Sequence, residues 1–236
     1  MARRLPTLSV VMPAYNEERT IEAVLERVRA VPVVSQVVVV DDCSSDSTRA
    51  LLTRYATQMP PGAPSLCVVS HVTNQGKGAA IRTGLARASG DVVVIQDADL
   101  EYEPEQFLPM LELLARENAA VVYGSRFRGS VTGMRLPNLI ANKILTFLAN
   151  VLFGAKITDE ATCYKMFRRS ALTDLPLRAQ RFDFCPEVTA KLLRRGHRIL
   201  EVPIRYRARS AQEGKKIRWT DGIQAIWAII KYRFVD

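Results

Sequence analysis

The sequence predicts one α/β domain whose mainly parallel β-sheet is flanked by helices. Its 236 residues suit a single sizeable core and fall short of two full domains. In the first half, short runs of β-branched residues alternate with stretches of helical period, which is typical of successive βαβ units. Two acidic clusters follow such runs, at the place where open α/β sheets gather their ligands.

Between residues 8 and 123, apolar β-branched runs predict strands, and the periodic stretches between them predict helices. Asp46, as an N-cap, and Pro104, at a first helical position, mark the beginnings of two of the helices. The expected strands are Leu8–Met12, Val37–Val40, Leu66–Ser70, Val92–Ile95 and Ala120–Tyr123. The expected helices are Glu17–Arg29, Ser47–Thr57, Lys77–Ala88 and Pro104–Glu117.

The alternation stops after about residue 126. The sequence then predicts a long apolar segment, a short strand, a helix and a last strand, at Leu136–Phe153, Cys163–Arg168, Asp183–Arg195 and Ile199–Tyr206. We therefore expect residues 126–236 to elaborate the sheet that residues 1–125 begin.

Positive charge is concentrated in that second half. The whole chain carries a net charge of +9, but residues 1–125 hold 11 Lys or Arg against 15 Asp or Glu, and residues 126–236 hold 22 against 9. Such a surface can attract nucleic acid, an anionic membrane or a phosphorylated substrate, and charge alone does not choose among them.

The cysteines and histidines are too scattered for a zinc site or a thiol redox motif. Cys43, Cys67, Cys163 and Cys185 form no close pairs, and the chain opens with no secretory signal, which together favour a reduced, cytoplasmic setting. No run is as long and apolar as a membrane-spanning helix, so we expect no segment that crosses a bilayer.

The triplet Asp97-Ala98-Asp99 is the strongest chemical signal in the chain. It follows the strand Val92–Ile95, whose alternation would point both carboxylates to one side. Two carboxylates there could hold Mg²⁺ or Mn²⁺ together with substrate phosphates, and Glu101 could complete the coordination. The alternative is a solvated acidic turn before the helix at Pro104.

Four blocks in order extend this signal: P-A-Y-N-E-E at 13–18, D-D-C-S-S-D-S-T at 41–48, N-Q-G-K-G at 74–78 and D-A-D at 97–99. Together they resemble glycosyltransferase family 2 of the GT-A fold. The resemblance implies a nucleotide-sugar donor, with Lys77 near its diphosphate, Asp97 contacting it and Asp99 ligating the cation. It also implies a nucleoside pocket lined by Pro13, Tyr15, Glu17 and Asp42.

Further blocks narrow the resemblance to the dolichyl- or polyprenyl-phosphate mannose and glucose synthases. They are Gly124-Ser125-Arg126, Thr158-Asp159, Phe182-Asp183-Phe184 and Glu201-Val202-Pro203-Ile204. This branch implies GDP-mannose or UDP-glucose as donor and a polyprenyl phosphate as acceptor, at the cytoplasmic face of a membrane. The chain departs from the branch at Gly214, where a serine is usual before Lys215, and at Thr162-Cys163-Tyr164.

A phosphate acceptor is mostly dianionic at neutral pH, so it can attack without a general base but needs positive charge around it. Arg126, Arg135, Arg209 and Lys215 could supply that charge, and we expect Asp97, Arg126, Arg209 and Lys215 to be catalytic. Inversion at the sugar carbon would follow from a single displacement.

Two other functions remain open. A hydroxyl acceptor would need a base, for which Asp183 is the candidate. A nucleic-acid-binding module would use the basic half, but it lacks a known reader motif and leaves the acidic strand ends unexplained, so we expect no nucleic-acid partner.

Near the C-terminus, an apolar stripe would form either a peripheral membrane contact or a core-packed helix; its residues are Ile223, Ile226, Trp227, Ile230 and Phe234.

Overall fold

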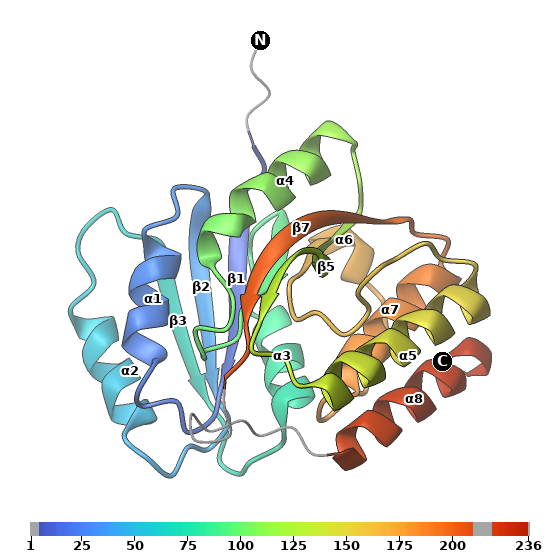
Figure 1. Cartoon of the computed structure of the whole chain (residues 1–236). Coiled ribbons are helices and arrows are strands. Elements are labelled where there is room, and N and C mark those ends of the chain that lie inside the picture. The colour runs from blue at the N-terminus through green and yellow to red at the C-terminus, as the bar shows by residue number, and fades with distance from the viewer. Residues whose placement is uncertain (1–4, 210–218, 236) are drawn as a thin grey trace.

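A computed structural model of the chain describes residues 5–209 and 219–235. Its centre is a seven-stranded sheet in the order β3-β2-β1-β4-β6-β5-β7. Figure 1 labels β3, β2, β1, β5 and β7 of this sheet. All adjacent strands pair in parallel except at β6, which is antiparallel to both of its neighbours. The strands are β1 (Leu8–Ala14), β2 (Val34–Asp41), β3 (Ser65–Ser70), β4 (Val92–Ile95), β5 (Val121–Thr132), β6 (Lys165–Arg168) and β7 (Ile199–Arg207).

Helices cover both faces of the sheet, and each face has its own apolar core. One core packs α1, α2 and α4 against the sheet, and the other packs α3, α5, α6, α7 and α8. Alternate residues of β1 enter the two cores, Val10 and Met12 the first and Val11 the second. The helices are α1 (Ile21–Arg29), α2 (Thr48–Thr57), α3 (Lys77–Leu85), α4 (Phe107–Arg116), α5 (Leu136–Phe153), α6 (Arg169–Leu172), α7 (Phe184–Arg194) and α8 (Trp219–Phe234), with a 3₁₀ turn, η1 (Pro104–Gln106), before α4.

The predicted α/β class and mainly parallel sheet are confirmed, and most differences lie at element boundaries. α1 begins at Ile21 rather than Glu17, because residues 15–20 form a loop that packs on the neighbouring strand end. α2 follows Ser47 as its N-cap, although the Asp46 carboxylate still accepts the Thr48 N–H at 2.9 Å. Pro104 opens the 3₁₀ turn as expected.

β5 continues well past the expected end at Tyr123. It runs beside β7 to Thr132, with an irregularity in the pairing between Ser125 and Ser130. Gly129 lies in this irregularity, where a Cβ would stand 2.0 Å from the carbonyl oxygen of Ile204. Only glycine admits that approach, so the strand pair can extend beyond the rest of the sheet.

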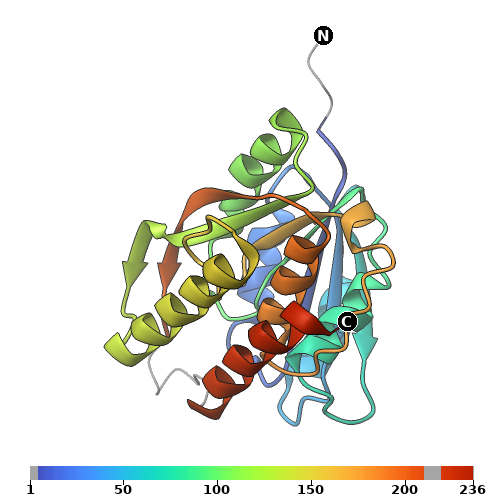
Figure 2. The ribbon, with the colours of Figure 1, turned by 90° about the vertical axis from the view of Figure 1, so that its right-hand side faces the viewer.

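The expectation that no segment could cross a bilayer is wrong by length and composition. α5 has 18 residues, a mean hydropathy of 1.4 and only 17% of its residues buried. It packs against α7 and α8 along one side, and Figure 2 shows α5 and α8 next to each other on the surface. Burial in the core therefore accounts for only part of its apolar character.

Candidate active site

The carboxyl ends of β1, β2 and β4 lie at one edge of the sheet. Parallel pairing sets Ala14 of β1 beside Asp41 of β2, and Val11 of β1 beside Ile95 of β4. Hydrogen bonds then join the three loops that follow, because Thr20 Oγ1 donates to the Ala98 carbonyl at 2.7 Å. Loops that are far apart in sequence therefore converge around the Asp97-Ala98-Asp99 triplet.

Four carboxylates and two cations meet at this edge. Lys77 Nζ lies 2.6 Å from Asp97 Oδ1. Arg209 reaches two other carboxylates, with Nη2 at 2.8 Å from Asp99 Oδ2 and Nη1 at 3.1 Å from Glu17 Oε2. The fourth carboxylate, Glu101, accepts the backbone N–H of Arg209 at 2.7 Å. The site thus groups residues that lie near positions 17, 77, 97–101 and 209 of the chain.

The pKa values of the two aspartates separate because their neighbours differ. Burial would raise the pKa of Asp97, but the charge and hydrogen bond of Lys77, with the Cys163 thiol and the charge of Arg209, together outweigh it and hold that pKa below its ordinary value. Burial raises the pKa of Asp99 to about 7, and the negative charges of Asp97 and Glu101 add to the effect. Asp99 is therefore short of positive charge even with Arg209 beside it.

Lys77 stands at the beginning of α3, where the loop at residues 179–181 packs against the first turn of the helix. The carbonyl of Gln180 accepts the Ala79 N–H at 3.1 Å. Gly76 and Gly78 allow this, because a Cβ at either would stand 2.4 or 2.8 Å from backbone oxygens of the 179–181 loop. The two glycines thus let the 179–181 loop pack closely against this segment. Lys77 is the residue between them, and its charge points at the triplet.

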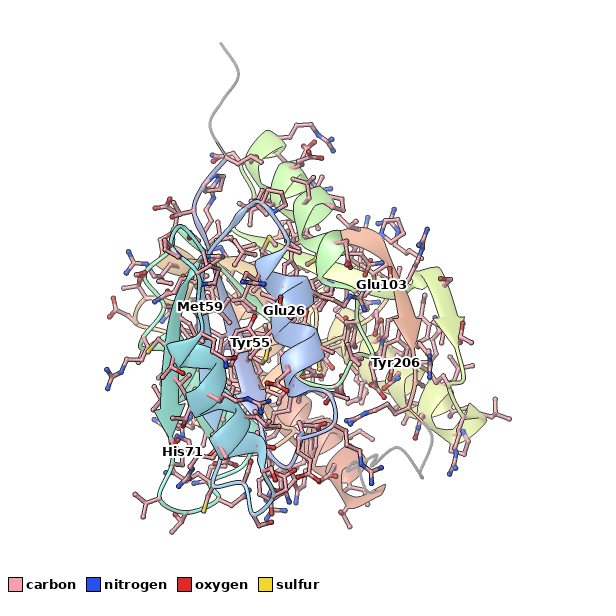
Figure 3. The ribbon with its side chains drawn as sticks, turned by 90° about the vertical axis from the view of Figure 1, so that its left-hand side faces the viewer. Glu26, Tyr55, Met59, His71, Glu103 and Tyr206 are labelled. Atoms are coloured by element: carbon pink, nitrogen blue, oxygen red, sulfur yellow. The ribbon has the colours of Figure 1, made fainter. Side chains whose placement is uncertain are left out.

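Asp42 holds the loop after β3 in place. Its carboxylate accepts the N–H groups of Gln75 and Gly76 at 2.8 and 2.7 Å, and it lies 2.7 Å from His71 Nδ1. Figure 3 labels His71, which marks this edge of the sheet. The side chain of Tyr15 is 37% exposed beside these loops, whereas Pro13 is buried inside β1. Of the predicted nucleoside-pocket residues, Tyr15 is the most accessible.

Arg126 is not presented to solvent as an acceptor-binding residue would be. It is 5% exposed, and its Nε and Nη2 atoms both donate to the buried carboxylate of Asp159 at 2.7 Å. Its guanidinium also lies over the ring of Tyr206, 5.1 Å from the centroid, and Tyr206 donates to Glu101 Oε2 at 2.8 Å. Figure 3 labels Tyr206 on β7. Arg126 thus contacts the carboxylate cluster only indirectly, through Tyr206 and its hydrogen bond to Glu101.

The remaining predicted site residues are dispersed. Arg135 is exposed at the N-cap of α5, and Asp183 is half-buried at the N-cap of α7, where it accepts the Arg181 N–H at 2.8 Å. Lys215 lies outside the described residues. Within the described part of the chain, neither Arg135 nor Asp183 forms a hydrogen bond or an ion pair with the carboxylate cluster.

Two supporting residues were missed by the sequence analysis. Cys163 accepts a hydrogen bond from Lys77 Nζ at 3.1 Å, in the segment where the sequence departs from its relatives. Glu187, fully buried, accepts the Arg178 and Ala179 N–H groups and so fixes the loop that covers α3. The available signal for Glu187 was Lys191, four residues later on the same helix, the spacing at which two helical side chains meet.

The donor atoms fit a divalent cation that shares its coordination with a substrate. Among residues 5–209 and 219–235, no group of three His, Cys, Asp or Glu side chains is arranged to hold a metal by itself. The cluster offers carboxylate oxygens, which Mg²⁺ and Mn²⁺ prefer, and Asp99 is buried close to the negative charges of Asp97 and Glu101. Such a cation would take its other ligands from phosphate oxygens.

Comparisons with known proteins identify the family of the chain. The model of the family described as "Glycosyl transferase family 2" matches residues 9–175. The undecaprenyl-phosphate mannosyltransferase of Micrococcus luteus is 32% identical over 87% of this chain and 85% of its own length. The hexosyltransferase Agl6 of low-salt glycan biosynthesis in Haloferax volcanii is 28% identical over 98% of this chain, which spans 54% of that relative's length.

Solved structures of a related enzyme show the same fold. Glucosyl-3-phosphoglycerate synthase from Mycobacterium tuberculosis, in complex with Mn²⁺, UDP and phosphoglyceric acid, superimposes with a TM-score of 0.73. The match covers 98% of this chain and 80% of the other, at 26% sequence identity. The predicted GT-A fold is thereby confirmed.

Proposed function

This chain belongs to glycosyltransferase family 2. From that premise we propose that it transfers a hexose from a nucleoside diphosphate sugar to a polyprenyl phosphate. The observation that carries the proposal is the convergence of Asp97 and Asp99 with Lys77 and Arg209 at the carboxyl edge of the sheet. Relatives whose names specify undecaprenyl, polyprenol or dolichyl phosphate support the choice of acceptor. GDP-mannose and UDP-glucose are the donors to be tested first.

In this mechanism the side chains bind and stabilise charged groups, and none of them transfers a proton. Tyr15 and Asp42 would border the nucleoside, and Asp97, held ionised by Lys77, would bind the donor. The acceptor phosphate would attack the anomeric carbon directly and invert its configuration. Arg209 and Arg135, with Lys215 if it reaches the site, would bind the phosphates of donor and acceptor. Arg126 would position Tyr206 and Glu101 through its buried pair with Asp159.

We propose Mg²⁺ or Mn²⁺ as the cofactor, held by Asp99 with Glu101 and by the donor diphosphate. Mn²⁺ or Mg²⁺ accompanies UDP in solved complexes of the mycobacterial synthase, which supports this assignment. When bound, the cation would neutralise charge on the departing nucleoside diphosphate.

The decisive experiment supplies radiolabelled GDP-mannose or UDP-glucose, Mn²⁺ and a polyprenyl phosphate, and counts label that partitions into organic solvent. We expect labelled lipid from the wild-type chain and at least about a hundredfold less from Asp97→Asn, since electrostatic groups of an active site contribute about that factor. Labelled lipid that never forms with any donor would contradict the proposal. Phosphoglycerate serves as a parallel acceptor, because label on it would favour the hydroxyl alternative, with Asp183 as base.

We further propose that the α5–α8 surface contacts the membrane in which the acceptor resides, on its cytoplasmic face. By this surface we mean the exposed apolar side chains of the two adjacent helices, which are Leu136, Ile140, Ile144, Phe147, Val151, Ile223, Trp227 and Phe234. The residues that α8 buries are others, namely Ala225, Ala228, Ile229 and Tyr232. Packing against the protein's own core therefore does not account for most of the predicted stripe, although Ile226 and Ile230 are half-buried. Exposed lysines and arginines beside the surface suit anionic headgroups.

Vesicle co-sedimentation tests the membrane contact. Phe147, 65% exposed on α5, becomes aspartate in the test variant, and Val72, 93% exposed in the loop after β3, becomes aspartate in the control. We expect binding to anionic phospholipid vesicles to fall with Phe147→Asp and to persist with Val72→Asp. Equal binding by both variants would refute the assignment of this surface.

A further inference from the structure

Arg209 occupies the carboxylates that the proposed cation would need. Its guanidinium pairs with Asp99 at 2.8 Å and with Glu17 at 3.1 Å, and its Nε lies 3.8 Å from Glu101. The side chain is only 15% exposed, so solvent screens these pairs weakly. One guanidinium thus holds the same part of the cluster that a divalent ion would hold.

The backbone around Arg209 is fixed in this position by Glu101. One oxygen of the Glu101 carboxylate accepts the Arg209 N–H at 2.7 Å, and the other accepts the Tyr206 hydroxyl at 2.8 Å. The Glu101 carbonyl also accepts the Arg207 N–H at 3.0 Å. Three bonds therefore fasten the end of β7 to the loop after β4, and they aim Arg209 at Asp99.

The charges explain why a resident cation is needed. Glu17, Asp97, Asp99 and Glu101 come together in partly buried surroundings, and Lys77 is committed to Asp97. Within residues 5–209 and 219–235, Arg209 is then the cation that meets Asp99, and like charges so close would otherwise repel one another. A divalent ion at the same carboxylates would supply the same neutralisation, and it would repel the guanidinium.

We propose that Arg209 is a built-in counter-cation that competes with the divalent metal for Asp99, and that metal binding frees its guanidinium to pair with the donor diphosphate. This inference rests on the proposed function. A guanidinium forms paired hydrogen bonds with phosphate as readily as with carboxylate, so the released side chain has a partner only when donor and metal are both present. The competition therefore couples metal binding to donor binding.

The test measures Mn²⁺ binding to the full chain without donor, from the electron paramagnetic resonance signal of free Mn²⁺. Arg209→Gln should bind Mn²⁺ about tenfold more tightly than the wild type, because an interaction with a charged group changes an equilibrium by roughly that factor. Arg209→Lys, which keeps the charge but loses the fork that spans two carboxylates, should fall between them. With GDP or UDP added, the advantage of Arg209→Gln should shrink or reverse.

Matched variants separate this inference from general charge effects. Arg205 lies on β7, four residues before Arg209, is 76% exposed and approaches Glu103 only at 3.9 Å, so Arg205→Gln removes an equal charge and should bind Mn²⁺ like the wild type. Adding Asp99→Asn to Arg209→Gln should abolish the gain. Unchanged or weaker Mn²⁺ binding by Arg209→Gln would overturn the inference while leaving the proposed transferase intact. Absence of Mn²⁺ binding from every variant, with or without nucleotide, would count against both.

Discussion

The buried ion pair of Glu187 and Lys191 offers a quantitative test of how the loop beside the active site is supported. Glu187 Oε1 lies 2.7 Å from Lys191 Nζ, and both side chains are almost wholly shielded from solvent. Glu187→Gln keeps an acceptor for the loop but leaves the ammonium without its counter-charge. Breaking a buried pair from one side costs about 3–5 kcal/mol, a large share of the roughly 5–15 kcal/mol by which a domain is stable.

Lys191→Met should cost a similar amount, because it leaves the Glu187 carboxylate buried and charged. The ammonium also donates to the Pro176 carbonyl and lies 4.4 Å from the ring centroid of Tyr232, contacts that methionine replaces only in part. The double variant removes both charges, so it should cost less than the sum of the single variants. We expect a coupling free energy of at least about 2 kcal/mol, since groups in contact couple by up to roughly 3 kcal/mol.

Urea unfolding followed by circular dichroism measures all four corners of this cycle. Additivity of the two single variants to within about 0.5 kcal/mol would refute the reasoning, because independent sites add to that accuracy. A nucleotide-sugar titration of each folded variant gives a second readout. Weaker donor binding is expected wherever the 178–181 loop loosens, since Gln180 caps the helix that presents Lys77.

Two further predictions concern glycines and buried charge. Gly78→Ala should destabilise the fold by about 1–3 kcal/mol, as overpacking does, because its Cβ would stand 2.8 Å from the Ala179 carbonyl oxygen. Gly222→Ala in α8, where nothing lies within 4 Å, should instead stabilise by about 0.5–1 kcal/mol, and thermal unfolding compares the two. Burial raises the pKa of Glu160 in the folded state, although the charge of Lys165 opposes it, so the stability that Glu160 contributes is present below its unfolded pKa and is lost as pH rises through the folded value. Unfolding free energies of Glu160→Gln and wild type should therefore shift in favour of glutamine between about pH 4 and neutral pH, and a difference that does not change with pH would contradict this.

The strands and the acidic triplet were predictable because their signals are local. Runs such as Val92–Ile95 carry β propensity and burial in a few consecutive residues, and parallel strands necessarily bring their carboxyl ends to one edge. The order of the four motifs then indicated the family. These signals do not depend on which distant segments of the chain pack together.

Tertiary structure alone decided which charges meet. Arg126 reads in sequence as an exposed basic residue, but it is buried against Asp159, which lies 33 positions further along the chain. Gly76 and Gly78 appear in sequence only as part of the N-Q-G-K-G block, and the structure shows the 179–181 backbone packed against both of them. Arg209 meets Asp99 across 110 positions because β7 ends beside the loop after β4. Such pairings depend on how the two layers of helices pack on the sheet. A buried charge needs a partner because desolvation is costly, but the sequence around the charged residue does not show which distant residue that partner is.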